Sequence, residues 1–433
     1  MSALIIFMFV FLIIIVVGML NEKFFRMPTD VALVLFSTCI GVILLLLSGT
    51  GWLPKLNEAL EHFDNFSFSD FLLHGVICFL LFAGASKVHF SKFVSNIKVI
   101  SLMSMLTTIV FAAVYGVLFW LVSLAFRLNI DPWVCIMLGC ILSPTDPRAA
   151  TGVLEKLGIS KGTATVIEGE SLLNDGTGVA LFVFARSVVE NVHSENFFLS
   201  MTKEILGAAV IAFVFSFVTF RLLRATRNPI TQIVISLFNV SCVYILCETF
   251  GFSGDIASVI CGLYYAYHMD KIRRQQEVKD ERNLYGDFWD IVDHLLNSLL
   301  FVLIGLSVLT IKFDASFVLL YLCAILIIIV SRMVSVSTST LMIGHKKMPS
   351  GYSFAEFVTL MTWTALKGGI SLALVLSTKE LLAQTPWVYT VLLNVTYISI
   401  LFTVISQGLT VGLGYKLVER HKIKRMMKRG LYR

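Results

Sequence analysis

Carboxylate, amide and hydroxyl side chains gather on two short segments of an otherwise apolar sequence. The first segment, residues 143–147, reads SPTDP and contains Asp146; the second, residues 168–178, reads EGESLLNDGTG and contains Asp175. Oxygen ligands of this kind suit hard cations rather than zinc or copper. At helical period, one face of the second segment carries Ser171, Asn174, Asp175 and Gly178, with Glu170 at its edge. These residues predict a monovalent cation held by Asp175, Asp146, Ser171 and the Thr145 carbonyl.

The same two carboxylates suggest a way to exchange ions. Desolvation and the like charge of a neighbour both oppose the ionisation of a buried acid. A proton at Asp175 would then compete with the cation, so the site would hold one or the other in turn. The alternative is that Asp146 and Asp175 only cap helices or pair within a bundle. It is disfavoured because Asp146 lies between two helix-breaking prolines.

The composition indicates which solvent surrounds these residues. Of the 433 residues, 57% are apolar and only 14% are charged, and long apolar runs recur from residue 2 to residue 415. Runs of this length cross a lipid bilayer. Residues 2–20 lack a basic start and a small-residue cleavage site, so we expect a retained first helix. The eight cysteines lie in apolar segments and are expected to be buried, and the basic residues are spread over short loops, which excludes a nucleic-acid partner.

The apolar runs predict a single transmembrane domain over residues 1–415, followed by a short basic cytoplasmic tail over 416–433. We place thirteen crossings, at residues 2–20, 30–48, 71–88, 99–126, 133–156, 162–190, 201–224, 230–248, 253–268, 288–310, 315–343, 352–378 and 388–415. An odd number puts the two termini on opposite sides. Lysine and arginine dominate every second loop, which predicts an outer N-terminus and a cytoplasmic C-terminus.

Two of these crossings are expected to be broken in the middle. The prolines of residues 143–147 interrupt the fifth crossing, and the lysine and two glycines of residues 366–371 (LKGGIS) interrupt the twelfth. Broken helices at bilayer depth occur where they line a cavity, and a matched pair points to the binding site of a transporter. We therefore expect a transport core formed by residues 99–190 and 315–415.

Two basic residues lie inside this expected core. Arg332 is the only charge within the eleventh crossing, so it must pair with an acid, and Glu170 is the predicted partner. Contact with a lipid headgroup is disfavoured because apolar or small residues flank Arg332 on both sides. Lys367 is predicted to offset the carbonyl ends of the interrupted half-helices. A titrating role for Lys367 is the alternative.

Four further titratable residues have two open interpretations. Asp290, Asp293 and His294 stand at the start of the tenth crossing, and Glu356 stands near the start of the twelfth. They either line an entrance to the site or are simply solvated.

These motifs resemble the monovalent cation:proton antiporter-1 family of sodium/proton exchangers. The segments that carry the resemblance are SPTDP at 143–147, EGESLLNDGT at 168–177 and LKGGISL at 366–372, and it extends through nearly the whole chain. The resemblance implies an all-α fold of thirteen helices with an inverted repeat and two crossed, broken helices. It also implies an elevator-like core and a homodimer formed mainly by residues 2–88 and 201–310. By resemblance, the ion site comprises Thr145, Asp146, Glu170, Ser171, Asn174 and Asp175.

Two details refine what the resemblance implies. The pair Asn174-Asp175 is similar to relatives that exchange one cation for one proton without net charge, whereas two adjacent aspartates are typical of electrogenic relatives. Lys367 departs from the arginine of many relatives and lacks its planar fork of donors. The short tail resembles prokaryotic members, so we expect a multi-pass protein of a prokaryotic plasma membrane.

The sequence thus predicts a secondary transporter that exchanges Na⁺ or Li⁺ for H⁺, with no cofactor and no enzymatic activity. Its partners would be monovalent cations, protons, the lipid bilayer and a second copy of the chain. Potassium/proton exchange through the same residues is one alternative. A cation channel is an alternative from a different class, although paired broken helices argue against it.

Overall fold

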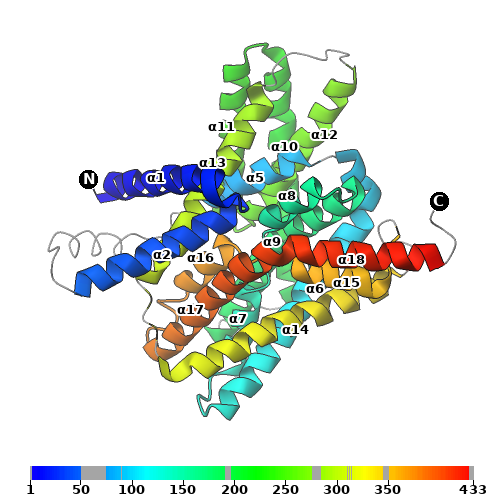
Figure 1. Ribbon diagram of the computed structural model, residues 1–433. Helices are drawn as coiled ribbons and strands as arrows, with labels where there is room; N and C mark the ends of the chain where they lie inside the picture. Colours follow the sequence, from blue (N-terminus) through cyan, green and yellow to red (C-terminus); the bar gives the residue numbers. More distant parts are fainter. Residues whose placement is uncertain are drawn as a thin grey trace.

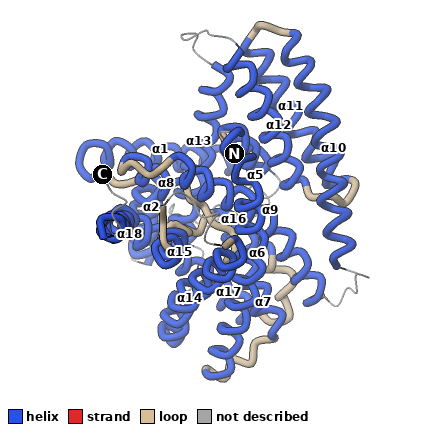
Figure 2. The backbone as a smooth tube through the Cα atoms, turned by 90° about the vertical axis from the view of Figure 1, so that its right-hand side faces the viewer, coloured by secondary structure: helices blue, strands red, loops and turns tan. Residues whose placement is uncertain are grey.

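The computed structural model of the chain is helical, and no strand occurs in the part that it describes. The described residues are 2–49, 75–88, 90–190, 197–275, 284–309, 311, 313, 315–344 and 351–428. The backbone views show the helices in two groups, with α10, α11 and α12 at the top of Figure 1 and α6, α14 and α15 at the bottom. The turned view in Figure 2 keeps this separation.

The helices fall into two triplets and a remainder. The first triplet contains α6 (Phe90–Ala125), the pair α7 (Pro132–Ile141) and α8 (Arg148–Lys156), and α9 (Lys161–Val189). The second contains α14 (Val318–Ile343), the pair α15 (Phe354–Trp363) and α16 (Gly369–Ser377), and α17 (Pro386–Leu401) with η6 (Phe402–Gln407) and α18 (Gly408–Lys428). The others are α1 (Ser2–Leu20), α2 (Thr29–Gly49), α5 (Ile77–Lys87), α10 (Phe197–Ala225), α11 (Pro229–Thr249), α12 (Gly254–Gln275) and α13 (Leu284–Leu306).

The helix lengths agree with a multi-pass membrane protein. Within the described residues, nine helices are long and apolar enough to cross a bilayer. The helix α5, the helix α12 and the two broken pairs lie in the other four predicted crossings. A helix therefore occupies each predicted crossing, while the number that span the membrane stays a prediction.

Both predicted breaks are confirmed. The first helix of the fifth crossing, α7, is capped by Asp131, whose carboxylate accepts a hydrogen bond from the Trp133 N–H at 2.7 Å, and it ends at Ile141. Residues 142–147 are not helical because Pro144 and Pro147 lack the N–H that continues a helix. In the twelfth crossing, residues 364–368 are likewise unwound between α15 and α16.

The two triplets pack against each other. The long helices α6 and α14 run along one another, α6 also contacts α7 and α9, and α17 contacts α14 and α16. The remaining helices pack mainly among themselves, with extensive contacts between α5 and α12 and between α2 and α13. This arrangement matches the expected grouping of the chain, whose division into a transport core and a dimerisation scaffold stays a prediction.

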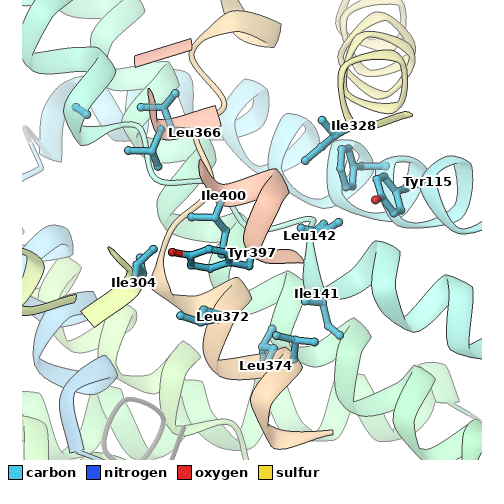
Figure 3. Close-up of a cluster of buried hydrophobic side chains, with 14 of the residues drawn as sticks. Tyr115, Ile141, Leu142, Ile304, Ile328, Leu366, Leu372, Leu374, Tyr397 and Ile400 are labelled. Atoms are coloured by element: carbon cyan, nitrogen blue, oxygen red, sulfur yellow. The ribbon is translucent and has the colours of Figure 1, made fainter. Parts of the chain in front are cut away.

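Apolar side chains fill the space around the broken helices. Figure 3 shows Ile141 and Leu142 at the end of α7 near Leu374 of α16, with Tyr397 of α17 beside Ile304. These side chains are all buried, and the Tyr397 hydroxyl donates to the Gly305 carbonyl at 3.2 Å. The broken segments thus lie among close-packed side chains.

The C-terminal end differs from the prediction. The last crossing was expected to end at residue 415 and to be followed by a tail, but α18 continues to Lys428. Tyr415 and Val418, which lie three residues apart on one face, are buried, and the Arg425 guanidinium pairs with Glu356 at 2.8 Å. The basic residues from Lys416 to Lys428 therefore belong to the helix α18, and residues 429–433 lie outside the described part.

Candidate ion-binding site

The two unwound segments meet and are joined by hydrogen bonds. The Asp146 N–H donates to the Leu366 carbonyl at 2.8 Å, so one break satisfies the backbone of the other. The Lys367 N–H donates to the Thr403 hydroxyl at 3.1 Å, and Thr403 lies in the π-helical turn η6. π-Helical turns are rare and often occur at functional sites. The crossing point is therefore a built junction of three interrupted helices.

Lys367 lies at this junction, where its charge was predicted to offset exposed carbonyls. Its side chain is 1% exposed, and its ammonium group donates to the Pro144 carbonyl at 3.3 Å. The same ammonium group lies 4.5 Å from the centre of the Phe111 ring, a favourable cation–π distance. The position of Lys367 is thus the one that the structural interpretation requires.

The helix α9 approaches the first break very closely at Gly178. A Cβ atom at this position would lie only 2.7 Å from Cγ of Pro144. The absence of a side chain lets the unwound segment rest directly on α9. About two turns earlier in α9, the Ser171 hydroxyl donates to the Thr145 carbonyl. The ligand groups predicted from the two motifs are therefore brought together.

Asn174 holds the same unwound segment through both the nitrogen and the oxygen of its side-chain amide. Its Nδ2 group donates to the Thr145 hydroxyl at 2.8 Å and to Glu170 Oε1 at 3.3 Å, while its Oδ1 accepts from the Thr145 N–H at 3.4 Å. Asn174 is fully buried. A carboxylate in its place could not donate, so the amide is needed for this geometry.

Glu170 and Arg332 form a buried, two-pronged ion pair. Arg332 Nη1 and Nη2 donate to Glu170 Oε1 and Oε2, both at 3.0 Å. The side chains are 2% exposed for Glu170 and 5% for Arg332. Paired groups of this geometry are strong and directional. The partner predicted for Arg332 is the one in the structure.

A cavity of about 190 Å³ opens beside the junction and is lined by four of the predicted residues, Thr145, Asp146, Ser171 and Asp175. Asp175 is partly exposed, and no hydrogen bond or ion pair joins its carboxylate to any described residue. Glu170 and Asn174 do not line the cavity. Within the predicted site they position the broken segment instead of facing the cavity.

Asp146, the second acid in the cavity, is paired with a base. Arg148 Nε lies 3.4 Å from Asp146 Oδ1, and its Nη1 lies 2.6 Å from Oδ1 of Asp293 on α13. Asp293 also receives the Lys87 ammonium at 2.9 Å and the Asn297 amide at 2.9 Å. This network joins the first broken helix to α5 and α13 across the cavity.

The family model described as the transmembrane sodium/hydrogen exchanger matches residues 7–413. The chain belongs to this family.

Relatives of this exchanger-family chain agree in length and fold. The Na⁺/H⁺ antiporter NhaP of Pseudomonas aeruginosa is 29% identical over 396 residues, which cover 90% of this chain and 91% of that protein. NhaH of Halobacillus aidingensis is 27% identical with the same coverage. The solved sodium proton antiporter MjNhaP1 of Methanocaldococcus jannaschii matches with a TM-score of 0.72 and 19% identity, covering 98% of this chain and all of that one. The predicted fold class is thus confirmed.

Sequence reasoning missed one basic residue of this exchanger-family site, Arg148. Arg148 follows Pro147 directly and lies inside a predicted crossing, so the rule that marked Arg332 as functional would also have marked Arg148. Of the residues with two open interpretations, Asp293 is buried in the network, whereas Asp290 and His294 are exposed. Glu356 lies elsewhere, where it completes the capping box of α15 with Ser353.

Proposed function

We propose that the chain exchanges Na⁺ or Li⁺ for H⁺, one for one, with Asp175 as the group that carries either ion. The observation that carries this proposal is the Asp175 carboxylate, which lines the cavity at the junction and has no partner among the described residues. Family membership supports the class of cargo. The cation and the proton are substrates, and the mechanism uses no resident cofactor.

The arrangement of the site supports a partly dehydrated cation. Asp175 and Asp146 supply carboxylate oxygens, Ser171 supplies a hydroxyl, and the unwound segment exposes the Thr145 carbonyl. The Ser171 hydroxyl donates to that carbonyl, and both oxygens keep lone pairs that can face a cation. Oxygen ligands around a single charge suit Na⁺ and Li⁺ better than softer ions.

The pairing of charges supports exchange of one cation for one proton. The charge of Glu170 is offset by Arg332, and that of Asp146 is offset by Arg148. Asp175 is the acid left to change its state, and Asn174 beside it is neutral. A single carboxylate without an ion-pair partner among the described residues binds a single positive charge, whether that charge is Na⁺ or H⁺.

Movement of the site between the two faces completes the proposal. The triplets α6–α9 and α14–α18 would move as the transport core against α1, α2, α5 and α10–α13, which would form the homodimer. The N-terminus would lie outside and the C-terminus in the cytoplasm of a prokaryotic plasma membrane. The self-contained packing of the two groups supports such a movement.

Exchange can be measured directly in proteoliposomes. The purified protein is reconstituted, an acidic interior is imposed, and the fluorescence of a quenched pH dye is followed as Na⁺, Li⁺ or K⁺ is added outside. We expect Na⁺ and Li⁺ to restore the fluorescence, and we expect the Asp175→Asn protein to give none of this recovery while eluting as the same folded species on size exclusion. Full recovery with Asp175→Asn would refute the site.

The same assay separates the competing functions. Recovery with K⁺ at concentrations where Na⁺ has no effect would replace the sodium proposal by potassium/proton exchange. Single-channel currents in planar bilayers would indicate a channel. A wild-type protein that responds to none of the three cations and passes no current would refute cation/proton exchange altogether.

A further inference from the structure

A second cavity lies farther along α9 than the ion site, toward the C-terminal end of the helix. It has a volume of about 730 Å³ and is lined by the C-terminal half of α9, the loop between α11 and α12, and the residues that follow α16. These loops are predicted to lie on the outer side of the membrane, opposite the cytoplasm. Its charged lining residues are Glu204, Glu248, Asp255 and Glu380 against Arg186 and Lys379. Acids outnumber bases, so the cavity concentrates cations.

Asp255 is the acid in this cavity that is withdrawn from solvent. It lies in the first turn of α12 and is only 8% exposed. Its Oδ1 atom is buried, and no group among the described residues donates a hydrogen bond to it. A buried carboxylate oxygen without a partner is costly, and a cation or a proton would remove that cost.

Asp255 and Asp175 lie on either side of a close helix contact. A Cβ at Gly176, the residue after Asp175, would lie 3.1 Å from Cγ1 of Ile256, the residue after Asp255. Yet Asp175 lines the ion-site cavity and Asp255 lines the second one. The contact of Gly176 with Ile256 thus forms part of the wall between two cavities, with one acid on each face.

Glu248 adds an exposed carboxylate at the approach to Asp255. It stands at the end of α11, and its Oε1 accepts a hydrogen bond from the Gly254 N–H at 3.0 Å. Glu248 Oε2 remains available to a hydrated ion, because the structure shows no donor to it among the residues described. A cation that enters the second cavity would therefore meet Glu248 first and the buried Asp255 next.

We propose that Asp255 is a second site for the transported monovalent cation, occupied as the ion passes between the second cavity and Asp175. The inference rests on the proposed function, because it extends the route of the same ion. In this proposal the contact between Gly176 and Ile256 is part of the barrier between the two cavities, and the movement of the core opens that barrier. Cations would reach this second site from one side of the membrane only.

The test compares cation dependence from the two faces. Right-side-out and everted membrane vesicles expose opposite faces, and initial exchange rates give the half-saturating Na⁺ concentration at each. In Asp255→Asn we expect this concentration to rise about tenfold at the face of the second cavity, the outer face in the predicted orientation, and to stay unchanged at the other. Equal values for wild type and Asp255→Asn at both faces, or an equal rise at both, would overturn the proposal.

Two further variants make the result specific. Glu380→Gln removes an exposed acid from the same cavity, and we expect less than a twofold change at either face. Glu248→Gln keeps the oxygen that accepts from Gly254 and should raise the half-saturating concentration about threefold at the same face only. This variant leaves Asp255 intact, so it tests the route even where Asp255→Asn does not fold. A Glu248→Gln protein with unchanged values would count against the route.

Failure of the inference is distinguishable from failure of the proposed function. In the wild type, the absence of Na⁺-dependent exchange from either face would refute exchange itself. Wild-type exchange with no face-specific change in the Asp255→Asn and Glu248→Gln proteins would refute only the second site.

Discussion

Removing one partner of the buried ion pair should destabilise the protein, and removing both charges should restore much of the loss. The change to make first is Arg332→Ala, which leaves Glu170 ionised in a site where it is 2% exposed. Among the described residues, the remaining donor to Glu170 is the Asn174 amide at 3.3 Å, which is long for a charged acceptor. Glu170 therefore keeps a charge with almost no compensation.

The size of the loss follows from the geometry of the pair. Breaking a buried ion pair by removing one partner costs about 3–5 kcal/mol. Arg332 Nε is buried without an acceptor among the described residues, so the wild-type pair is not fully satisfied and a value of about 3 kcal/mol applies. Glu170→Gln should have a similar cost, because it leaves the guanidinium without a counter-charge. The double variant should cost less than the sum of the two by at least about 2 kcal/mol.

The measurement is a double-mutant cycle on purified protein. Apparent Tm values are followed by intrinsic tryptophan fluorescence, and about 3 kcal/mol corresponds to a drop on the order of 5 °C for a chain of this length. A matched control cycle uses Arg186→Ala and Glu190→Gln, which break an ion pair of 2.8 Å whose side chains are 38% and 34% exposed. For that exposed pair we expect coupling below about 0.5 kcal/mol.

One result would refute this reasoning. If the effects of Arg332→Ala and Glu170→Gln add to within about 0.5 kcal/mol, the two residues do not depend on each other for stability. A wild-type Tm in the single variant Arg332→Ala would also show that the ion pair does not stabilise the protein.

Three further changes test the site itself. In Asp146→Asn we expect the half-saturating Na⁺ concentration to rise about tenfold with the Tm unchanged, because the backbone bond from Asp146 to Leu366 remains; an unchanged concentration would exclude Asp146 as a ligand. In Arg148→Gln the half-saturating Na⁺ concentration should fall about fivefold, because Asp146 loses the guanidinium that pairs with it. Lys87→Gln should leave the half-saturating concentration unaltered, because Lys87 pairs with Asp293. An equal change in both variants would contradict the pairing of Arg148 with Asp146. Asn174→Asp should make the exchange rate respond to an imposed potassium diffusion potential, and a rate independent of potential would refute the stoichiometric role of this position.

The elements of the site that depend on neighbouring residues in the chain were predictable. Proline and glycine act on the backbone within a turn of their own position, so both helix breaks could be placed to within a few residues. The pairing of Arg332 with Glu170 was predictable for another reason. Each is a costly charge in an apolar segment, and few partners were available to satisfy it.

The features that were missed depend on contacts between distant helices. Asp293 is joined to Lys87 across 206 positions and to Arg148 across 145. At the level of sequence Lys87 and Asp293 looked like charges of helix ends, because hydropathy does not show which ends lie side by side. Asp255 was missed for the same reason, since its burial is produced by the packing of α12 against α5, α9 and α11.

The balance of charges at the junction bears on how the membrane potential acts on transport. The junction holds three basic residues, Arg148, Arg332 and Lys367, and three acids, Asp146, Glu170 and Asp175, so its charges sum to zero when Asp175 is ionised. Binding of Na⁺ or H⁺ at Asp175 then leaves the same charge of +1 in both loaded states. A potential of 100 mV is worth about 2.3 kcal/mol per charge moved across the membrane. It acts equally on the movement of the Na⁺-loaded site and on the return of the H⁺-loaded site, so it does not drive net exchange in either direction. A second aspartate at position 174 would break this equality whenever the two loaded states differ in the number of protons or cations bound. The neutral amide of Asn174 is the donor that holds Thr145, and in the exchange that we propose it also keeps the two loaded states alike in charge.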